Sequence, residues 1–275
     1  MLLKIKDLFH RNATLAILTR LYSNKAKLNQ YQKIIIMNLI KRIVSPVLIL
    51  FIGFLAILPA QADGIKGNGN VQTEEREVGN FETIKVSGAF TIYLSQDDDY
   101  SLKVVADENL LDIIKSKVKG DVLYISTEKS IYKSKEMKLY IGFKHLSGLK
   151  ANGAISLKSD QMLRFDELDI EINGASSADL ELTANRLRID NSGASSIKLA
   201  GKCDEVSIDI SGAGSVSAYD LIVKRGSIDI SGVGSGKVCV EDDLRVSISG
   251  IGSVKYKGEP KVTSDISFLG SLKKY

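Results

Sequence analysis

Apolar and polar residues alternate in short runs along residues 149–271, and each run ends at the same small-residue phrase. In one repeat Ile208 and Ile210 alternate with polar residues before the pair Ser211-Gly212. Seven copies occur, with the leading position at 153, 174, 193, 212, 232, 250 and 268, so the steps are 21, 19, 19, 20, 18 and 18 residues. A fixed period near 20 residues is typical of solenoids, whose coils bury their apolar faces against one another.

A period of two with β-branched residues predicts strands rather than helices. Stacking of like coils pairs each strand in parallel with its copy in the next coil, about 4.7–4.9 Å away. We therefore predict an all-β fold, a parallel β-solenoid with coils of about 18–21 residues. A β-sandwich with hairpin turns is the alternative, but it gives no reason for one turn to recur in every repeat.

Glycines mark one corner of each predicted coil. Glycine permits φ > 0 and lets neighbouring backbones approach closely, so we expect both at this corner. The structural glycines of the prediction are Gly153, Gly174, Gly193, Gly212, Gly232, Gly250 and Gly270.

The segment 63–148 is less regular than the Gly-Ser repeats of 149–271. Its one helical pattern lies in the window 107–118, where Leu110, Leu111, Ile114 and Val118 share a face and Asp107 is a candidate N-cap. We expect this short helix to cover the open edge of the first coil. Ser87-Gly88 is a looser eighth copy of the corner, and strands are expected over 122–125 and 138–141.

Residues 1–62 have the composition of a targeting segment. Residues 1–42 carry nine basic residues and one acid, residues 43–58 are uncharged and apolar, and Ala60-Gln61-Ala62 follows. Counted from Met37, this predicts a signal peptide over 37–62 that is cleaved after Ala62. The apolar run is shorter than the ~20 residues of a spanning helix, although an uncleaved membrane anchor is the alternative. Residues 1–36 are an unusual preface to a signal, so we expect translation to begin at Met37.

Removal of the leader reverses the net charge. The whole chain is +4, residues 1–42 contribute +8 and residues 43–62 contribute none, which leaves −4 for the single domain 63–275. Binding of nucleic acid needs a basic face, so we expect no nucleic-acid partner, and contact with a membrane only through the signal segment. The domain is expected to be exported, to the periplasm, the outer cell surface or the medium.

The two cysteines are not expected to pair. Cys203 and Cys239 lie two predicted coils apart, about 9–10 Å, which exceeds the Cα separation that a disulfide tolerates. We predict that both are unpaired packing residues.

Carboxylates recur three residues before the leading glycine. This column reads Glu171, Asp190, Asp209, Asp229, Ser247 and Asp265. Neighbouring carboxylates repel, so either solvent, salt and the nearby Arg188 and Arg245 neutralise them, or a cation lies between the rungs. Oxygen ligands favour calcium, so a weak calcium ladder at Glu171, Asp190, Asp209 and Asp229 is one hypothesis and a solvated polar face is the other. No other cofactor is expected.

Signatures of catalysis are sparse. His145 is the only histidine of 63–275 and is expected to be a plain surface residue, and Asp97, Asp98 and Asp99 read as a solvated turn. No phosphate loop, CxxC pair or H-E-x-x-H motif occurs. The alternative function, a carbohydrate-active β-helix enzyme of polysaccharide-lyase type, would need carboxylates and an Arg or Lys base in one groove.

Several short motifs occur in a fixed order: Gly67-Asn68-Gly69-Asn70, Arg76-Glu77-Val78, Asp107-Glu108-Asn109-Leu110 and the Ser-Gly-x-Gly-Ser repeats. Over nearly all of residues 67–270 the chain resembles the head GIN domain family of autotransporter adhesins. The resemblance implies a β-helical fold similar to pectin-lyase-like solenoids, a role in adhesion and no catalytic residues. Phe268 replaces the last leading glycine and indicates a capping coil. We predict a non-enzymatic exported adhesin or envelope-interaction module whose partner is a glycan or protein at the cell surface.

Overall fold

The part of the chain that the structure describes is built almost entirely from strands. The computed structural model describes residues 64–275, which belong to the one compact unit Asp63–Tyr275. The predicted signal peptide and the segment 1–36 lie outside the described residues and stay predictions. Within residues 64–275, no helix has the length and apolar character needed to cross a membrane.

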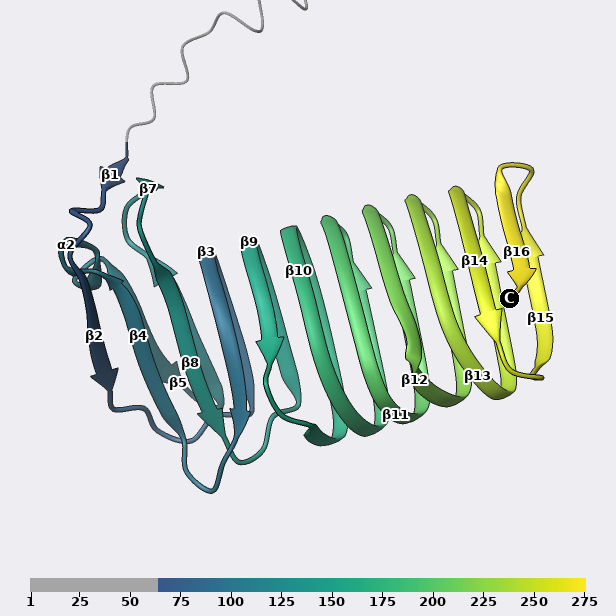
Figure 1. Ribbon diagram of the computed structural model, residues 1–275, viewed down its shortest axis with the longest axis horizontal. Coiled ribbons are helices and arrows are strands. Elements are labelled where there is room, and N and C mark those ends of the chain that lie inside the picture. The colour runs from purple at the N-terminus through teal and green to yellow at the C-terminus, as the bar shows by residue number, and fades with distance from the viewer. Residues whose placement is uncertain (1–63) are drawn as a thin grey trace, which may run out of the picture. The chain divides into compact units, whose positions relative to one another are not determined.

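Six strands form the regular part of the solenoid, and each pairs in parallel with the next. Figure 1 shows them as a stack of similar coils. They are β9 (Gly148–Ser159), β10 (Leu163–Asn191), β11 (Ala194–Ile210), β12 (Ala213–Ile230), β13 (Val233–Ile248) and β14 (Ile251–Lys257). The parallel β-solenoid is confirmed. The hairpin sandwich is excluded, because two-residue hairpins join antiparallel neighbours.

The core is a set of aliphatic columns that run through the stack. Each coil has a front limb and a rear limb joined by bends (Figure 1). Every second side chain of a limb is buried between the two limbs. Ile189, Ile208 and Ile228 form one such column and are at most 1% exposed. Full burial of each contributes roughly 1.5–3 kcal/mol, and a coil without neighbours would leave its part of the column exposed, so the array folds as a unit.

The repeat begins at β3 (Thr83–Gln96). Gly88 of β3 pairs in register with Gly153 of β9, so the eighth copy of the corner is confirmed. β3 also pairs in parallel with β8 (Met137–Phe143) and β6 (Val122–Thr127), the two strands expected from the sequence. The other strands at this end are β4 (Ser101–Asp107), β2 (Val71–Arg76), β5 (Ile114–Lys119), β1 (Ile65–Lys66) and β7 (Ile131–Lys133).

The helix predicted over 107–118 is wrong in its length. α2 covers only Glu108–Leu111, and β5 begins at Ile114. Ile114 and Val118 alternate with lysines, so the same window also has a strand period, and antiparallel pairing with β6 selects the strand. The expected role as a cover is also wrong, because β8, β4 and β2 continue the sheet beyond β3 at this end, with β4 antiparallel to both neighbours.

Asp107 stands at the N-cap position of α2, but its side chain makes no capping hydrogen bond. The carboxylate is buried, and its Oδ2 accepts the backbone N–H of Lys135 at 3.1 Å. A Cβ on Gly67 would overlap this carboxylate, so a glycine is required there. Asp107 therefore fixes the segment before β8 against the first residues of the domain.

The last coil is formed by β15 (Lys261–Ile266) and β16 (Gly270–Lys274), which pair in parallel with β13 and β14. Phe268 lies between them and is 99% exposed. The Phe268 side chain points into solvent and does not itself cover the stack, and the expectation that its coil is a capping coil stays a prediction. Ile266 and Leu272 of the same coil are only partly buried, because no strand of the described residues pairs with the outer side of β15 or β16.

The leading glycines stack backbone on backbone. A Cβ on Gly174, Gly193 or Gly212 would overlap the carbonyl oxygen of the glycine one coil earlier, and the same holds for Gly232 and Gly250. The predicted close approach is confirmed. A positive φ is not the reason for these glycines, because among the column only Gly88 (135°) and Gly153 (120°) have one.

Gly270 belongs to a second column, two residues further along each coil. It pairs with Gly252, and a Cβ there would press on Ile266 and Ile248 of the core. This column faces inward, so Gly270 is a packing glycine and not a member of the corner column.

We expect Gly193→Ala to lower the free energy of unfolding by about 1–3 kcal/mol, because the added methyl forces two coils apart. Chemical denaturation followed by circular dichroism measures the change. Gly79→Ala is the matched control, since Gly79 has open space around its Cα and an ordinary φ. Equal stability of the two variants would contradict the proposed stacking.

Candidate interaction surface

Two outward columns follow the corner glycines and form a flat surface, which we call the Ala–Ser face. One column carries methyl groups and the other carries hydroxyls in ladder register across β3, β9, β10, β11 and β12. Its residues are Ala89, Ala154, Ala175, Ala194, Ala213, Thr91, Ser156, Ser177, Ser196 and Ser215. No side chain of the face is larger than threonine, so the surface is smooth.

A shallow, open groove of about 700 Å³ lies over the Ala–Ser face. Residues 134–137, which lead into β8, line it together with the face, and Lys135 and Glu136 are the only charged residues of its lining. Within the face the Ser177 hydroxyl donates to Ser156 Oγ at 3.1 Å. The groove thus offers hydroxyl and methyl groups at the coil repeat, with one charged edge.

The core beneath the groove is polar in two coils. Ser176 and Ser195 take the inward position that Phe90 and Ile155 hold in the earlier coils, and Asn191 is buried in an otherwise aliphatic column. Within residues 64–275, Ser195 Oγ and Asn191 Oδ1 have no hydrogen-bond partner. Sequence reasoning missed this feature, although Asn191 interrupts a column of isoleucines.

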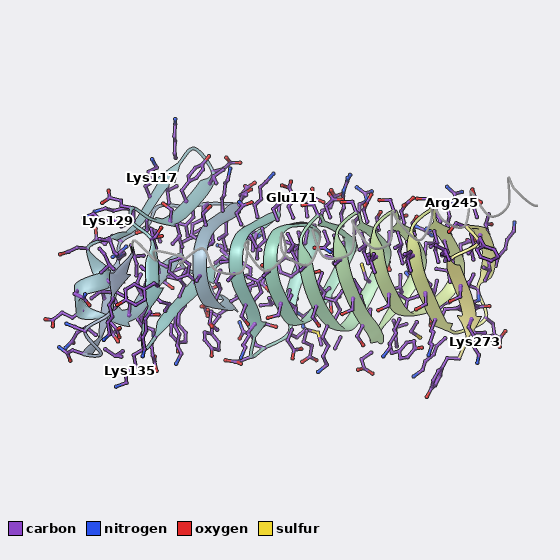
Figure 2. All side chains as sticks on the ribbon, turned by 90° about the horizontal axis from the view of Figure 1, so that it is seen from above. Lys117, Lys129, Lys135, Glu171, Arg245 and Lys273 are labelled. Carbon is purple, nitrogen blue, oxygen red and sulfur yellow. The ribbon has the colours of Figure 1, made fainter. Side chains whose placement is uncertain are left out.

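The acidic column forms on the other side of the solenoid. Asp190, Asp209 and Asp229 lie in register in adjacent coils, and the column continues through Ser247 to Asp265. Figure 2 shows Glu171 on one side of the stack and Lys273 on the opposite side. The candidate calcium ladder is therefore separate from the Ala–Ser face.

Basic residues neutralise one end of the acidic column. Lys150 Nζ lies 2.6 Å from Glu171 Oε1, and Arg188 Nε lies 3.0 Å from Asp190 Oδ2. Partial burial raises the pKa of Asp209, and the neighbouring Asp229 and Asp190 raise it further against the opposing effect of Arg188. Among residues 64–275, no group of three or more His, Cys, Asp or Glu side chains is arranged to hold a metal ion. The calcium ladder stays a prediction.

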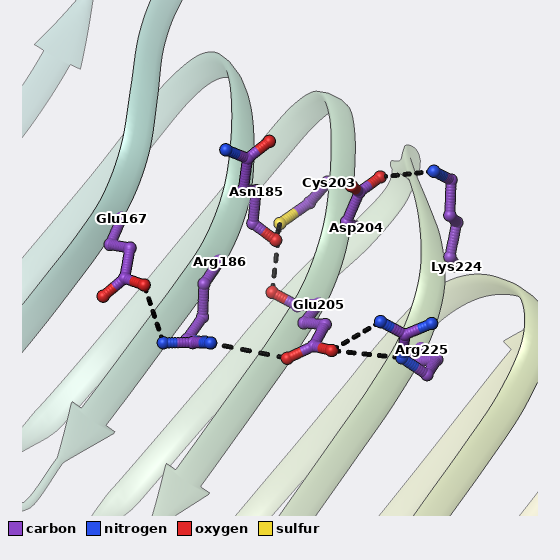
Figure 3. A network of polar contacts seen from close by, with 8 residues as sticks. All are labelled: Glu167, Asn185, Arg186, Cys203, Asp204, Glu205, Lys224 and Arg225. Atoms are coloured by element: carbon purple, nitrogen blue, oxygen red, sulfur yellow. Dashed lines mark hydrogen bonds and ion pairs between the residues drawn. The ribbon is translucent and has the colours of Figure 1, made fainter.

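A second charged column lies at the bend that joins the front limb to the rear limb, where Cys203, Asp204 and Glu205 lie, and its signs alternate from coil to coil (Figure 3). We call this bend the far bend. Arg186 bridges two acids, with Nη1 2.7 Å from Glu167 Oε1 and Nε 3.6 Å from Glu205 Oε2. Arg225 Nη2 lies 2.5 Å from Glu205 Oε1, and this hydrogen bond lowers the pKa of Glu205. The alternation of charge continues in register, since Arg225 pairs with Asp243 and Asp243 pairs with Lys261. This column was missed from the sequence, because it becomes visible only when the strands, not the glycines, are aligned.

The sequence candidates for catalysis do not assemble into a catalytic group. His145 is exposed and lines a hollow of about 490 Å³ with Arg164 and three acids, one of which, Glu167, is paired with Arg186. Among residues 64–275 no hydrogen bond joins His145 to a carboxylate. Asp97 to Asp99 form an exposed turn after β3, in which Asp97 Oδ2 accepts the Ser95 hydroxyl at 2.7 Å.

Both cysteines are free, as predicted. Cys203 is buried in the column of Val223 and Val240, and its thiol donates to the Glu205 carbonyl at 3.1 Å. Burial raises the pKa of Cys203 to about 11. Cys239 lies in a different column and is half-buried.

We expect iodoacetamide to alkylate Cys203 much more slowly than Cys239 in the folded protein at pH 8, because Cys203 is buried and protonated. Mass spectrometry of labelled peptides gives the two rates, and Cys239 is the internal control. Unfolding in urea should make the rates similar. Fast labelling of Cys203 before unfolding would show that its coil opens.

We expect Asp209→Asn to raise the free energy of unfolding at pH 7 by about 0.2–1 kcal/mol, because it removes like-charge repulsion across two rungs. The raised pKa of Asp209 means that folding favours the protonated carboxyl. Protonation of Asp209 therefore stabilises the fold fully below the pKa of Asp209 in the unfolded chain, and this stabilisation is lost as pH rises through the pKa in the folded protein. The advantage of the variant should vanish near pH 3. Urea titrations at both pH values test this, with Asp160→Asn as the control; a less stable variant at pH 7 would contradict it.

If the calcium ladder exists, calcium should raise the thermal midpoint relative to a chelator, and Asp209→Asn should abolish the difference. Differential scanning calorimetry measures both midpoints. A midpoint that is the same in calcium and in chelator removes the metal hypothesis and leaves the solvated face.

Comparisons with known proteins identify a family and several solved structures that this chain resembles. A family model described as "Putative auto-transporter adhesin, head GIN domain" matches residues 80–260. Among curated proteins, none matches the chain. Three crystal structures resemble it. A putative adhesin from Bacteroides fragilis is 26% identical with a TM-score of 0.74, and the match covers 77% of this chain and 100% of that one. A putative adhesin from Parabacteroides distasonis is 23% identical with a TM-score of 0.62 (78% of this chain, 100% of that one), and a putative lipid binding protein from the same organism is 24% identical with a TM-score of 0.60 (77% of this chain, 99% of that one). Since the matched residues are more than half of its length, the chain belongs to the head GIN domain family.

Proposed function

We propose that residues 63–275 form a non-enzymatic adhesion module of the cell envelope that binds its partner through the Ala–Ser face. Membership of the family and a structural neighbour named as an adhesin support the adhesive class. The groove along the Ala–Ser face carries the assignment of the binding surface, because it spans five coils with one repeated chemistry.

The chemistry of the face suits an extended partner. Serine hydroxyls both donate and accept hydrogen bonds, so a row of them matches the hydroxyl and carbonyl groups of a glycan or of an extended peptide. Alanine has no side-chain entropy to lose, and serine has little, so contact over many coils is not offset by ordering of long side chains. Each contact is weak, and the repetition supplies the affinity.

The same chemistry supports binding rather than turnover. General acid–base catalysis needs a titratable group within hydrogen-bond reach of the reacting atoms. The groove is lined by alanine and serine along the coils, and its two charged residues both come from the segment 134–137.

Export is part of the proposal and is supported by the predicted signal peptide and by the family. Protease shaving of intact cells distinguishes a surface protein, which is cleaved, from a periplasmic one, which is protected.

We expect Ser177→Arg combined with Ser196→Arg to reduce binding at least tenfold, because the long side chains fill the groove. The probe is an array of printed glycans and extracellular-matrix proteins. Ser207→Arg is the matched control, since Ser207 is an equally exposed serine in the rear limb.

Two results would overturn the proposal. One is identical array binding by the parent and the double variant. The other is turnover of an acidic polysaccharide that a single carboxylate substitution abolishes, since that outcome would assign the enzymatic alternative.

A further inference from the structure

The methyl column of the Ala–Ser face changes character in the last three coils. Val233, Ile251 and Leu269 replace alanine in the same register, with exposed fractions of 57%, 53% and 58%. Phe268 adds a fully exposed ring beside Leu269. We call these four residues the apolar rim. Exposed large apolar side chains in a continuous row mark an interaction site, whereas single ones do not.

A row of lysines occupies the same three coils. Lys237, Lys255 and Lys273 lie in register four residues after the rim positions, and none is within 4.0 Å of a carboxylate of the described residues. The earlier coils of this column alternate instead, and Lys198 Nζ lies 3.7 Å from Asp179 Oδ1. Three ammonium groups at the coil spacing repel one another, so an anionic partner is favoured.

The motif that unites the two features is visible in each coil: Val-Gly-Ser-Gly-Lys at 233–237, Ile-Gly-Ser-Val-Lys at 251–255 and Leu-Gly-Ser-Leu-Lys at 269–273. Each coil therefore presents an aliphatic group at the edge of the solenoid, a hydroxyl behind it and a cation about 13 Å from the rim along the strand. The acidic column lies on the opposite side, where Figure 2 shows Glu171, and does not neutralise this row.

We propose that the apolar rim and the lysine row dock on the surface of an anionic lipid bilayer. The four rim side chains enter the boundary between headgroups and acyl chains, and the lysines extend toward lipid phosphates at headgroup depth. A bilayer is the partner that explains both features, because it offers apolar chains and anionic groups at different depths. This surface lies in coils beyond the Ala–Ser groove, so the inference does not rest on the proposed function.

Two other occupants fit less well. A polyanionic glycan would pair with the lysines but would leave the aliphatic and aromatic rim in water. A second copy of the chain packed rim to rim would keep its acidic column on the far side of its own solenoid, so the lysine rows would stay unpaired.

The test is sedimentation with lipid vesicles, and it uses residues 63–275 so that the apolar leader does not contribute. This unit folds alone, since it holds the whole described core and the chain covers 99–100% of the matched crystal structures. We expect binding to vesicles of 30% phosphatidylglycerol in phosphatidylcholine, weak binding to pure phosphatidylcholine, and loss of binding in high salt.

Two variants separate the contributions. Phe268→Ser with Leu269→Ser should weaken binding at least tenfold, and replacing all three lysines by serine should weaken it about 100-fold, at a factor of about five for each lysine. The matched controls are Met162→Ser, which removes another exposed apolar side chain, and Lys202→Ser, which removes an exposed lysine at the far bend. Circular dichroism melts confirm that every variant folds.

Three outcomes would overturn the inference. The first is no difference between the anionic and the neutral vesicles. The second is retention on a heparin column without vesicle binding, which would assign the row to a polyanionic glycan. The third is self-association in analytical ultracentrifugation that Phe268→Ser abolishes, again without vesicle binding, which would assign the rim to a second copy.

Discussion

The structure depends on the close parallel stacking of like coils. Ladder hydrogen bonds fix the spacing between coils, and the corner glycines let the backbone at Gly174, Gly193 and Gly212 approach the carbonyl of the preceding coil where a Cβ would collide. Because the corner is the same in each coil, the strands on either side of it keep their register through the stack. Every surface column described above follows from that register.

Stacking in register places each side chain over its equivalent in the next coil, so like charges in one column repel unless opposite charges or solvent compensate them. At the far bend the signs alternate, and Arg186 and Arg225 each pair with Glu205. In the rear limb Asp209 and Asp229 are of one sign, and partial burial together with their repulsion raises the pKa of Asp209. The lysine row of the last coils repeats this arrangement with positive charge. Like-charge columns weaken the stack, so their presence next to a compensated column is consistent with roles in binding rather than in folding.

The front limb divides into two surfaces with different chemistry. Over β3 and β9 to β12 it offers small methyl and hydroxyl groups beside a groove, and over β13, β14 and β16 it offers aliphatic side chains, Phe268 and uncompensated lysines. The change in sequence is small, since it involves the residue after the corner glycine, the lysine column and Phe268 in place of the last corner glycine. A repeat scaffold can therefore carry two binding chemistries without a change of fold.

The period, the parallel solenoid, the corner glycines, the free cysteines and the acidic column could all be predicted from the amino-acid sequence, because each coil meets only its neighbours and repeats the same local pattern. Tertiary structure decided the features that depend on non-repeating partners. Ile114 and Val118 fit a helix or a strand, and pairing with β6 selected the strand. The outward direction of the Phe268 side chain was also decided by the fold, because the corner position exposes it. The alternating column at Glu205 and the groove beside residues 134–137 could not be predicted, because strand register and a distant loop create them.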